Sequence, residues 1–455
     1  GGGLRRERKG AGDEGEGMGS AISISRSERT ELAEDDESGY HGSRRSSPDS
    51  WPNGSSASGG KQATDKPCGL MCRKISRPVR SSKSFSIGPG SDAGVAKMRM
   101  GRGKSELRVQ YAAQTRGAPG KDQDRYALHV PSGGKNGLAL GIFDGHSVHG
   151  VRSGREHAAS VATQLPAALL HVVTRMGDAG ISTRPLTSHP GCVSSQRSLI
   201  GDDEPVLKAF DAEFSTLQAS LEERYHTEVA ERILAEKAKL EAEIGEEMSF
   251  ELPQEGGTTA TAMVIHPCGL FTAWVGDSRA VVGLYVPEAI SEGCGGRMPK
   301  SSVRAMPLTQ DHNLRDGRER ERLLACGGQI GVGDMANTHV FVKGAEGTLR
   351  ITRSIGDSPF HKAKAVSSAP DVTFHPLTTN VAFVVIASDG IWDVMDCDAV
   401  IAMVADVLSE NGSGLSTNAA CTACEAVIAK ALKISHERGC QVDDMSIAIA
   451  HFLHQ

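Results

Sequence analysis

Apolar segments of this sequence repeatedly meet an aspartate that stands beside a glycine or another small residue. Four junctions share this pattern: 143–146 (FDGH), 274–279 (WVGDSR), 387–390 (ASDG) and 442–446 (VDDMS). An aspartate is disfavoured in a strand, and its burial without a partner costs free energy. Each one alone is readily explained as a turn residue that caps the next element. Few lysines or arginines stand beside them, so the four together indicate a bound cation.

The ligand types of these junctions indicate which cation it is. Carboxylate oxygens without nearby histidine or cysteine pairs favour Mg²⁺ or Mn²⁺ over zinc. Two such ions about 4 Å apart would lower the pKa of a bridging water and hold the oxygens of a phosphate ester. Cys421 and Cys424 form a CxxC, but the pair lies in a predicted helix without a second pair, so a zinc site is not expected.

Hydrophobic periodicity predicts an α+β protein with antiparallel sheets. Alternating or continuous apolar runs predict strands at 106–111, 126–130, 137–143, 259–266, 270–285, 381–387 and 445–452. Three- and four-residue spacing predicts helices at 153–170, 207–233, 399–408 and 419–434. For the second helix, packing on a sheet is favoured over a coiled coil because strands resume soon after it. Asp316 and Glu319 have the spacing of a capping box that opens a short helix.

The N-terminal part of the chain differs in composition from the rest. Residues 1–104 consist mostly of Gly, Ser, Arg, Glu and Asp, which predicts a disordered tail before a folded domain at 105–455. Gly-, Ser- and Pro-rich stretches predict inserted loops at about 176–203 and 287–302. A net charge of −6 argues against nucleic-acid binding through bulk charge, and ten scattered cysteines are typical of an intracellular, reduced protein.

One motif in this tail concerns membranes. Met18-Gly19 begins a match to the myristoylation pattern, so Gly19 would be acylated if Met18 were the initiator. A chance match in a Gly- and Ser-rich tail is the alternative. One acyl chain binds membranes only marginally. The expected location is therefore cytoplasmic, nuclear or both, with peripheral membrane association if Gly19 is acylated.

Taken together, the motifs resemble the PP2C (PPM) family of metal-dependent Ser/Thr protein phosphatases. The likeness covers about residues 106–455, and the motifs stand in the order of the family. They are 120–124 (GKDQD), 143–146 (FDGH), 257–260 (GTTA), 275–279 (VGDSR), 309–312 (TQDH), 349–357 (LRITRSIGD), 388–394 (SDGIWDV) and 443–446 (DDMS).

This resemblance implies an α-β-β-α sandwich of two antiparallel sheets flanked by helices. It also implies hydrolysis of phosphoserine and phosphothreonine in proteins by a water or hydroxide bound to two metal ions, Mg²⁺ or Mn²⁺, and a weaker third ion. Phosphorylated proteins are the expected partners, and a monomer is expected.

Carried over position by position, the resemblance gives each acidic residue a role. Asp144 would bridge both metals, with the Gly145 carbonyl as a further ligand, and Asp389 and Asp443 would complete the other metal's shell. Asp124 would orient metal-bound waters. The third ion would use Asp277 and Asp393, with Asp389 shared. His146 is the expected general acid that protonates the leaving serine or threonine oxygen; the alternative is a histidine satisfied by a local hydrogen bond.

The chain departs from the family pattern at three positions. Pro119 stands where many members have a phosphate-binding arginine, which leaves Arg116 and Lys121 as nearby candidates. Gln123 replaces a frequent glutamate, and Asp444 replaces the usual asparagine. A pseudophosphatase that keeps the fold as a binding or regulatory module is therefore the second hypothesis. A P-loop kinase or ATPase is not expected, because no GxxxxGK[ST] sequence occurs.

Overall fold

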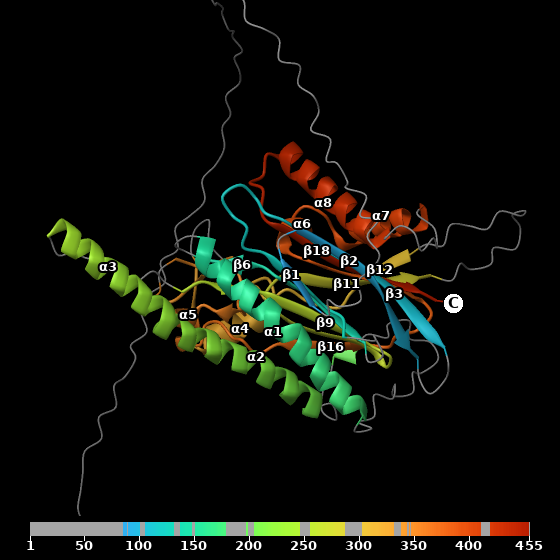
Figure 1. Ribbon diagram of the computed structural model, residues 1–455, viewed down its shortest axis with the longest axis horizontal. Helices are drawn as coiled ribbons and strands as arrows, with labels where there is room; N and C mark the ends of the chain where they lie inside the picture. Colours follow the sequence, from blue (N-terminus) through green and yellow to red (C-terminus); the bar gives the residue numbers. More distant parts are fainter. Residues whose placement is uncertain are drawn as a thin grey trace, which may run out of the picture. The chain divides into compact units, whose positions relative to one another are not determined.

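Two antiparallel sheets pack face to face in this computed structural model, and helices cover both outer faces (Figure 1). The structure describes residues 85–88, 90–100, 105–131, 137–147, 151–178, 197–198, 204–245, 255–286, 303–331, 338–343, 345, 347–410 and 419–454. All of them belong to one compact unit, Ser76–Gln455. The expected acylation site Gly19, most of the predicted tail and most of the two predicted loops lie outside the described residues.

The first sheet has seven strands. In spatial order they are β1 (Phe85–Gly88), β4 (Arg125–His129), β5 (Leu138–Phe143), β9 (Ala260–His266), β10 (Gly269–Val275), β16 (Asp371–His375) and β7 (Arg197–Ser198). The second sheet has six strands: β12 (Val303–Pro307), β11 (Arg279–Tyr285), β17 (Val381–Ala387), β18 (Met445–Leu453), β3 (Glu106–Arg116) and β2 (Gly90–Arg99). The strand ladders of both sheets are antiparallel, as the sequence predicted.

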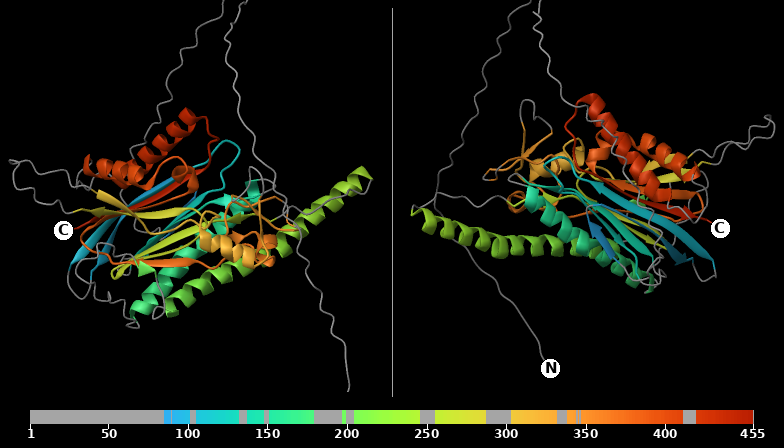
Figure 2. Two further views of the ribbon diagram at one scale, coloured as in Figure 1. Left: turned by 180° about the vertical axis from the view of Figure 1, so that it is seen from behind. Right: turned by 45° about the horizontal axis from the view of Figure 1, so that its top comes forward.

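Each interlayer space holds its own apolar core. Between the sheets lie side chains such as Leu140, Val384 and Phe452. Helices α1 (Val151–Asp178) and α2 (Glu204–Arg224) cover the first sheet, with Phe210 and Phe214 fully buried. Helices α7 (Cys397–Glu410) and α8 (Ala419–Arg438) cover the second sheet, and both views in Figure 2 show this order. The expected four-layer sandwich is confirmed.

The long predicted helix is only partly a packed one. Residues spaced by three and four on α2 are buried against α1 and the first sheet, as predicted. After a π-helical turn, η2 (Tyr225–Val229), the chain continues as α3 (Ala230–Ile244), which projects away from the sheets (Figure 1). Leu234, Leu240 and Ile244 are 43% to 54% exposed. The sequence pattern therefore predicted the packed segment correctly but not the projection.

Two boundaries predicted from the sequence are wrong. The segment 270–285 is not one strand: β10 lies in the first sheet and β11 in the second, because Gly276 adopts a φ of +99° and turns the chain between the layers. The folded part also begins before residue 105. Strand β2 pairs with β3 along its whole length, from Gly90↔Thr115 to Arg99↔Glu106. The sequence did not indicate this strand because it begins with Gly90 and Ser91. It lies at the edge of the second sheet and, within the described residues, pairs with β3 alone.

Short elements border the ends of the strands. These are β6 (Gly145–His146), β8 (Gly257–Thr258), β15 (Ile355–Gly356), α4 (Gly317–Ala325), β13 (Gln329–Ile330), β14 (Val340–Phe341), α5 (Ser358–Lys362) and α6 (Asp389–Trp392). Asp316 caps α4 through the backbone N–H of Arg318, as predicted. Glu319 does not complete a capping box, because its buried carboxylate pairs with Arg322 and Arg353 instead. None of the helices in the described ranges has the length and apolar composition of a membrane span.

Candidate active site

Aspartates from distant parts of the chain converge where the strands of both sheets end. Asp144 follows β5 in the first sheet, whereas Asp389 follows β17 and Asp443 precedes β18 in the second. Burial raises the pKa of Asp144 well above its ordinary value, and four neighbouring carboxylates raise it further: Asp124, Asp389, Asp443 and Asp277. Carboxylates perturb one another in this way only at short range. The two sheets therefore direct their acidic residues at one place.

Backbone contacts hold Asp144 at the edge of the first sheet. The backbone N–H of Asp144 donates to Oγ1 of Thr259 (3.1 Å), and its carbonyl accepts from the N–H of Thr259 (2.8 Å) and from Oγ1 of Thr258 (3.1 Å). The next residue, Gly145, has no room for a side chain, because a Cβ there would meet the carbonyls of Gly154 and Gln123. The GTTA and FDGH motifs thus fix the direction in which Asp144 leaves its strand.

The second sheet presents Asp389 and Asp443 through a pair of serines. The N–H of Ser388 donates to the carbonyl of Ser446 (3.0 Å), and the N–H of Ser446 donates to Oγ of Ser388 (3.0 Å). This reciprocal pair joins the end of β17 to the start of β18. Burial and the charge of Asp443 raise the pKa of Asp389 to about 6.

Asp124 is the most deeply buried member of this acidic cluster. Its side chain is 0% exposed, and within the described part of the chain neither carboxylate oxygen makes a hydrogen bond of ordinary geometry, although Asp144, Ser388 and Ser446 lie close enough to act on its pKa. Burial, followed by the charge of Asp444, raises its pKa to about 7. Buried polar atoms are rarely left unsatisfied, and each exception calls for an explanation such as an ion or a water. The oxygens of Asp124 are therefore suited to a cation or to the water around one.

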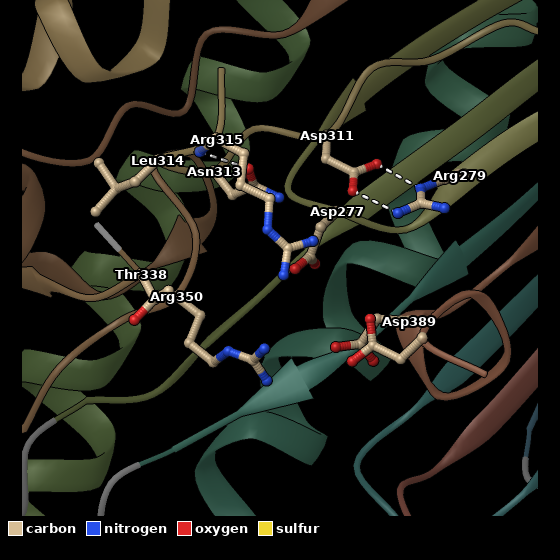
Figure 3. Close-up of a pocket in the computed structure, with 10 residues that line it drawn as sticks. Asp277, Arg279, Asp311, Asn313, Leu314, Arg315, Thr338, Arg350 and Asp389 are labelled. Atoms are coloured by element: carbon tan, nitrogen blue, oxygen red, sulfur yellow. Dashed lines mark hydrogen bonds and ion pairs between the residues drawn. The ribbon is translucent and has the colours of Figure 1, made fainter. Parts of the chain in front are cut away.

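The three aspartates expected for a weaker third ion share one pocket. Asp277, Asp389 and Asp393 all line it, together with Asp311 and residues from the segments 313–315, 338 and 350 (Figure 3). Burial and the charge of Asp389 raise the pKa of Asp277 to about 8. Asp311, in contrast, is neutralised by a bidentate pair with Arg279 at 2.6 and 2.7 Å.

His146 pairs with Asp357, a buried aspartate that lies in one of the sequence motifs but had no predicted role. Its Nε2 lies 2.7 Å from Oδ2 of Asp357, which is 2% exposed and also accepts from Oγ of Ser354 at 2.6 Å. Burial of the imidazole acts to lower its pKa, but the charge of Asp357 outweighs it, and the pKa of His146 is raised. Asp357 adopts a left-handed conformation (φ +48°). The sequence motifs gave no role to Asp357, although it is the last residue of 349–357 (LRITRSIGD).

The replacement of asparagine by Asp444 affects a loop. The Asp444 carboxylate accepts backbone N–H groups from Ala118 (2.6 Å), Asp122 (3.0 Å), Gln123 (2.6 Å) and Asp124 (3.3 Å). A carboxylate offers only acceptors, so it suits this set of donors better than an amide does. Asp444 therefore shapes the 118–124 loop that carries Asp124.

We expect Asp444→Ala to lower the free energy of unfolding by about 3 kcal/mol, because it leaves several buried N–H groups without an acceptor. Urea denaturation of the metal-free protein would measure this. The matched variant is Asp443→Ala, which removes a half-buried carboxylate from the neighbouring position and should cost far less. Equal losses in the two variants would contradict the role given to Asp444.

Lys121 and Arg116, the two residues expected from the sequence to bind phosphate, are not both available in the structure. Nζ of Lys121 forms an ion pair with Oδ1 of Asp443 at 2.6 Å, so it is engaged with an expected metal ligand. Arg116, at the end of β3, is exposed. Among the described residues, no three acidic, histidine or cysteine side chains already stand in the arrangement of a metal-binding group. The donors for a metal are present, but they are spread more widely than around a bound ion.

Comparison with known proteins identifies the class. The sequence model of the protein phosphatase 2C family matches residues 170–437, more than half of the chain, and the chain therefore belongs to this family. The match includes Asp277, Asp389 and Asp393 but not Asp124, Asp144, His146 or Asp443.

Individual relatives agree with the family match. The chain is 36% identical over 152 residues to a probable protein phosphatase 2C 48 of Oryza sativa subsp. japonica, covering 33% of this chain and 40% of that protein. It is 30% identical over 206 residues to a protein phosphatase 2C homolog 2 of Hypocrea jecorina, covering 44% and 40%. The chain thus spans well under two thirds of these curated relatives.

A solved structure agrees with the fold. The serine-threonine phosphatase 2C from Toxoplasma gondii superimposes with a TM-score of 0.52 over 80% of this chain and 100% of that chain, at 17% identity. At this identity, the likeness concerns the fold.

Proposed function

We propose that this chain is a metal-dependent protein serine/threonine phosphatase. The observation that carries the proposal is the convergence of Asp124, Asp144, Asp389 and Asp443 from both sheets onto one place, where the charges of the other three raise the pKa of Asp144. Such a concentration of negative charge is unfavourable unless cations neutralise it.

The donor set fits Mg²⁺ or Mn²⁺ in its chemistry. All of the donors are oxygens, as these ions prefer, and the buried carboxylate of Asp124 makes no hydrogen bond of ordinary geometry within the described residues. Asp144, with the Gly145 carbonyl, Asp389 and Asp443 would hold two ions, and Asp277 and Asp393 a weaker third. Bound there, the ions would supply Lewis-acid polarisation of the phosphate ester and lower the pKa of a water.

The chain's own residues supply the proton transfer. His146 donates its proton to the serine or threonine oxygen as the P–O bond breaks, since an alkoxide leaves poorly without protonation. Asp357 orients the imidazole through the bond to Nε2 and favours its protonated form. Because donation must come from a ring nitrogen that faces the substrate, the His–Asp pair has to loosen or the proton has to leave from Nδ1. Asp124 would orient water beside the bound metals.

Hydrolysis of a phosphothreonine peptide tests the proposal. We expect wild-type protein to release phosphate in Mn²⁺ or Mg²⁺ and not in EDTA, and Asp144→Ala to release none above background under either condition. Metal-independent release, or equal release by the two proteins, would refute the proposal.

A second candidate is a pseudophosphatase that acts as a binding module. The ion pair between Lys121 and Asp443 favours it, because this lysine provides a positive charge where a metal is expected. In that case the folded protein would bind phosphoproteins without turnover.

A further inference from the structure

Two arginines face the acidic side of the pocket in Figure 3. The guanidinium groups of Arg315 and Arg350 point into it, opposite Asp277 and Asp389. Both side chains belong to exposed residues, and within the described part of the chain neither guanidinium has a hydrogen bond or an ion pair. The charge of Arg350 acts to lower the pKa of Asp389, which places this guanidinium within electrostatic reach of the acidic cluster.

The backbone that presents these arginines is well anchored. A β-bridge joins Asn313 to Ile351, so the residues that precede Arg315 lie beside the residue that follows Arg350. The N–H of Thr352 donates to the carbonyl of His312 (2.9 Å), and the buried imidazole of His312 stacks on Trp274 with ring centroids 5.7 Å apart. The two side chains therefore start from fixed positions on neighbouring segments.

The acidic residues that the structure describes nearby do not form ion pairs with Arg315 or Arg350. Asp311 is already engaged by Arg279, and Asp316 by Arg318 at 2.9 Å. Asp277 and Asp389 are the side chains proposed to hold cations. With those cations bound, the pocket would have metal ions on one wall and two free guanidinium groups on the other. A phosphate group has oxygens for both walls, and arginine binds phosphate in a bidentate manner.

We propose that Arg315 and Arg350 bind the phosphate group of the phosphoprotein substrate. The inference rests on the proposed phosphatase function and adds to it the residues that hold the substrate. It also explains how a chain with Pro119, and with Lys121 paired to Asp443, still provides positive charge for a phosphate. The charge comes from the segments around β14 and α4 instead of from the 116–121 segment.

Steady-state kinetics test this assignment with small ligands. The experiment measures KM and kcat for p-nitrophenyl phosphate and the inhibition constant of inorganic phosphate at saturating Mn²⁺. We expect Arg315→Ala and Arg350→Ala each to raise KM and the inhibition constant about tenfold, and the double variant to raise them further. Since the arginines hold the phosphate before and during reaction, kcat should change much less. Arg350→Lys should give an intermediate value, because it keeps the charge without the fork.

The matched control is Arg318→Ala, which removes an exposed arginine from the adjacent helix but does not line the pocket. It should leave both constants within about twofold of wild type. If Arg315→Ala and Arg350→Ala also left the phosphate inhibition constant unchanged while the wild type turned over, the inference would be wrong and the phosphatase function would stand. The inference would also be wrong, and the phosphatase function would stand, if the two variants raised KM only for acidic peptides. The arginines would then bind acidic residues that flank the phosphorylated one. A wild type without metal-dependent turnover would overturn the function itself.

Discussion

Replacing Asp389 by asparagine is expected to reduce metal-dependent hydrolysis about 10³-fold or more. The variant keeps the size of the side chain at the start of α6 but removes one of the charges that would hold a metal. Mutation of residues that only hydrogen-bond to metal ligands typically costs about 10- to 100-fold in metal affinity or activity, so the loss of a ligand itself should cost more. Phosphate release from a phosphothreonine peptide, measured over a range of Mn²⁺ concentrations, would show whether added metal restores any of the loss.

The same substitution should increase the stability of the metal-free protein, although it lowers activity. The pKa values of Asp389 and Asp124 are raised to about 6 and about 7, so the folded chain retains protons that the unfolded chain releases. Stability in EDTA must then fall as the pH rises from about 4 to about 8. Asp389→Asn removes part of this repulsion, so we expect its melting temperature in EDTA at pH 8 to exceed that of the wild type.

Asp406→Asn is the matched control, since Asp406 is an exposed aspartate on α7, outside the cluster. It should change neither the turnover nor the dependence of stability on pH. A stabilised Asp389→Asn that still hydrolyses at the wild-type rate would contradict the proposed metal role. A destabilised variant would contradict the account of repulsion among the carboxylates.

Replacing His146 by glutamine is expected to reduce kcat by about 10²- to 10⁴-fold for a phosphoserine or phosphothreonine peptide. An alkoxide needs a proton to leave, whereas nitrophenolate is a stable anion that leaves without one. The loss for p-nitrophenyl phosphate should therefore be much smaller. A comparison of kcat for the two substrates, in wild type and variant, measures the proton transfer separately from metal binding. Equal losses for both substrates would show that His146 acts in another way.

The pair between His146 and Asp357 adds a pH dependence. Asp357 raises the pKa of His146, so the protonated imidazole persists to higher pH than an isolated one would. Removing this charge in Asp357→Asn should lower the pKa, and the alkaline limb of the kcat profile should move to lower pH. A purely structural role of Asp357 would reduce activity at every pH without moving the limb.

The sequence predicted the elements with strong local patterns and the acidic residues at their ends. The apolar run 381–387 is strand β17 with the same bounds, and the spacing of Phe210 and Phe214 identified the packed face of α2. The sequence also predicted that distant aspartates gather in one place; in the structure, the charges of Asp124, Asp389, Asp443 and Asp277 raise the pKa of Asp144.

Features that depend on tertiary contacts could not be derived in this way. The pairing of His146 with Asp357 joins residues 211 positions apart, and no local pattern indicates it. The turn between sheets at Gly276 looks like a continuous strand because both sides are apolar. The approach of Arg315 and Arg350 depends on the bridge between Asn313 and Ile351, which is a contact of two irregular segments.

Calorimetric titration of the metal-free protein with Mn²⁺ tests the central claim most directly, because it measures cation binding without requiring a substrate. We expect the wild type to bind two ions per chain and to release protons as the carboxylates with raised pKa values ionise. Tight binding should be lost in Asp144→Ala and retained in Asp406→Asn. A wild-type protein that bound no Mn²⁺ beyond the level of Asp144→Ala would contradict the claim that these carboxylates form a metal centre.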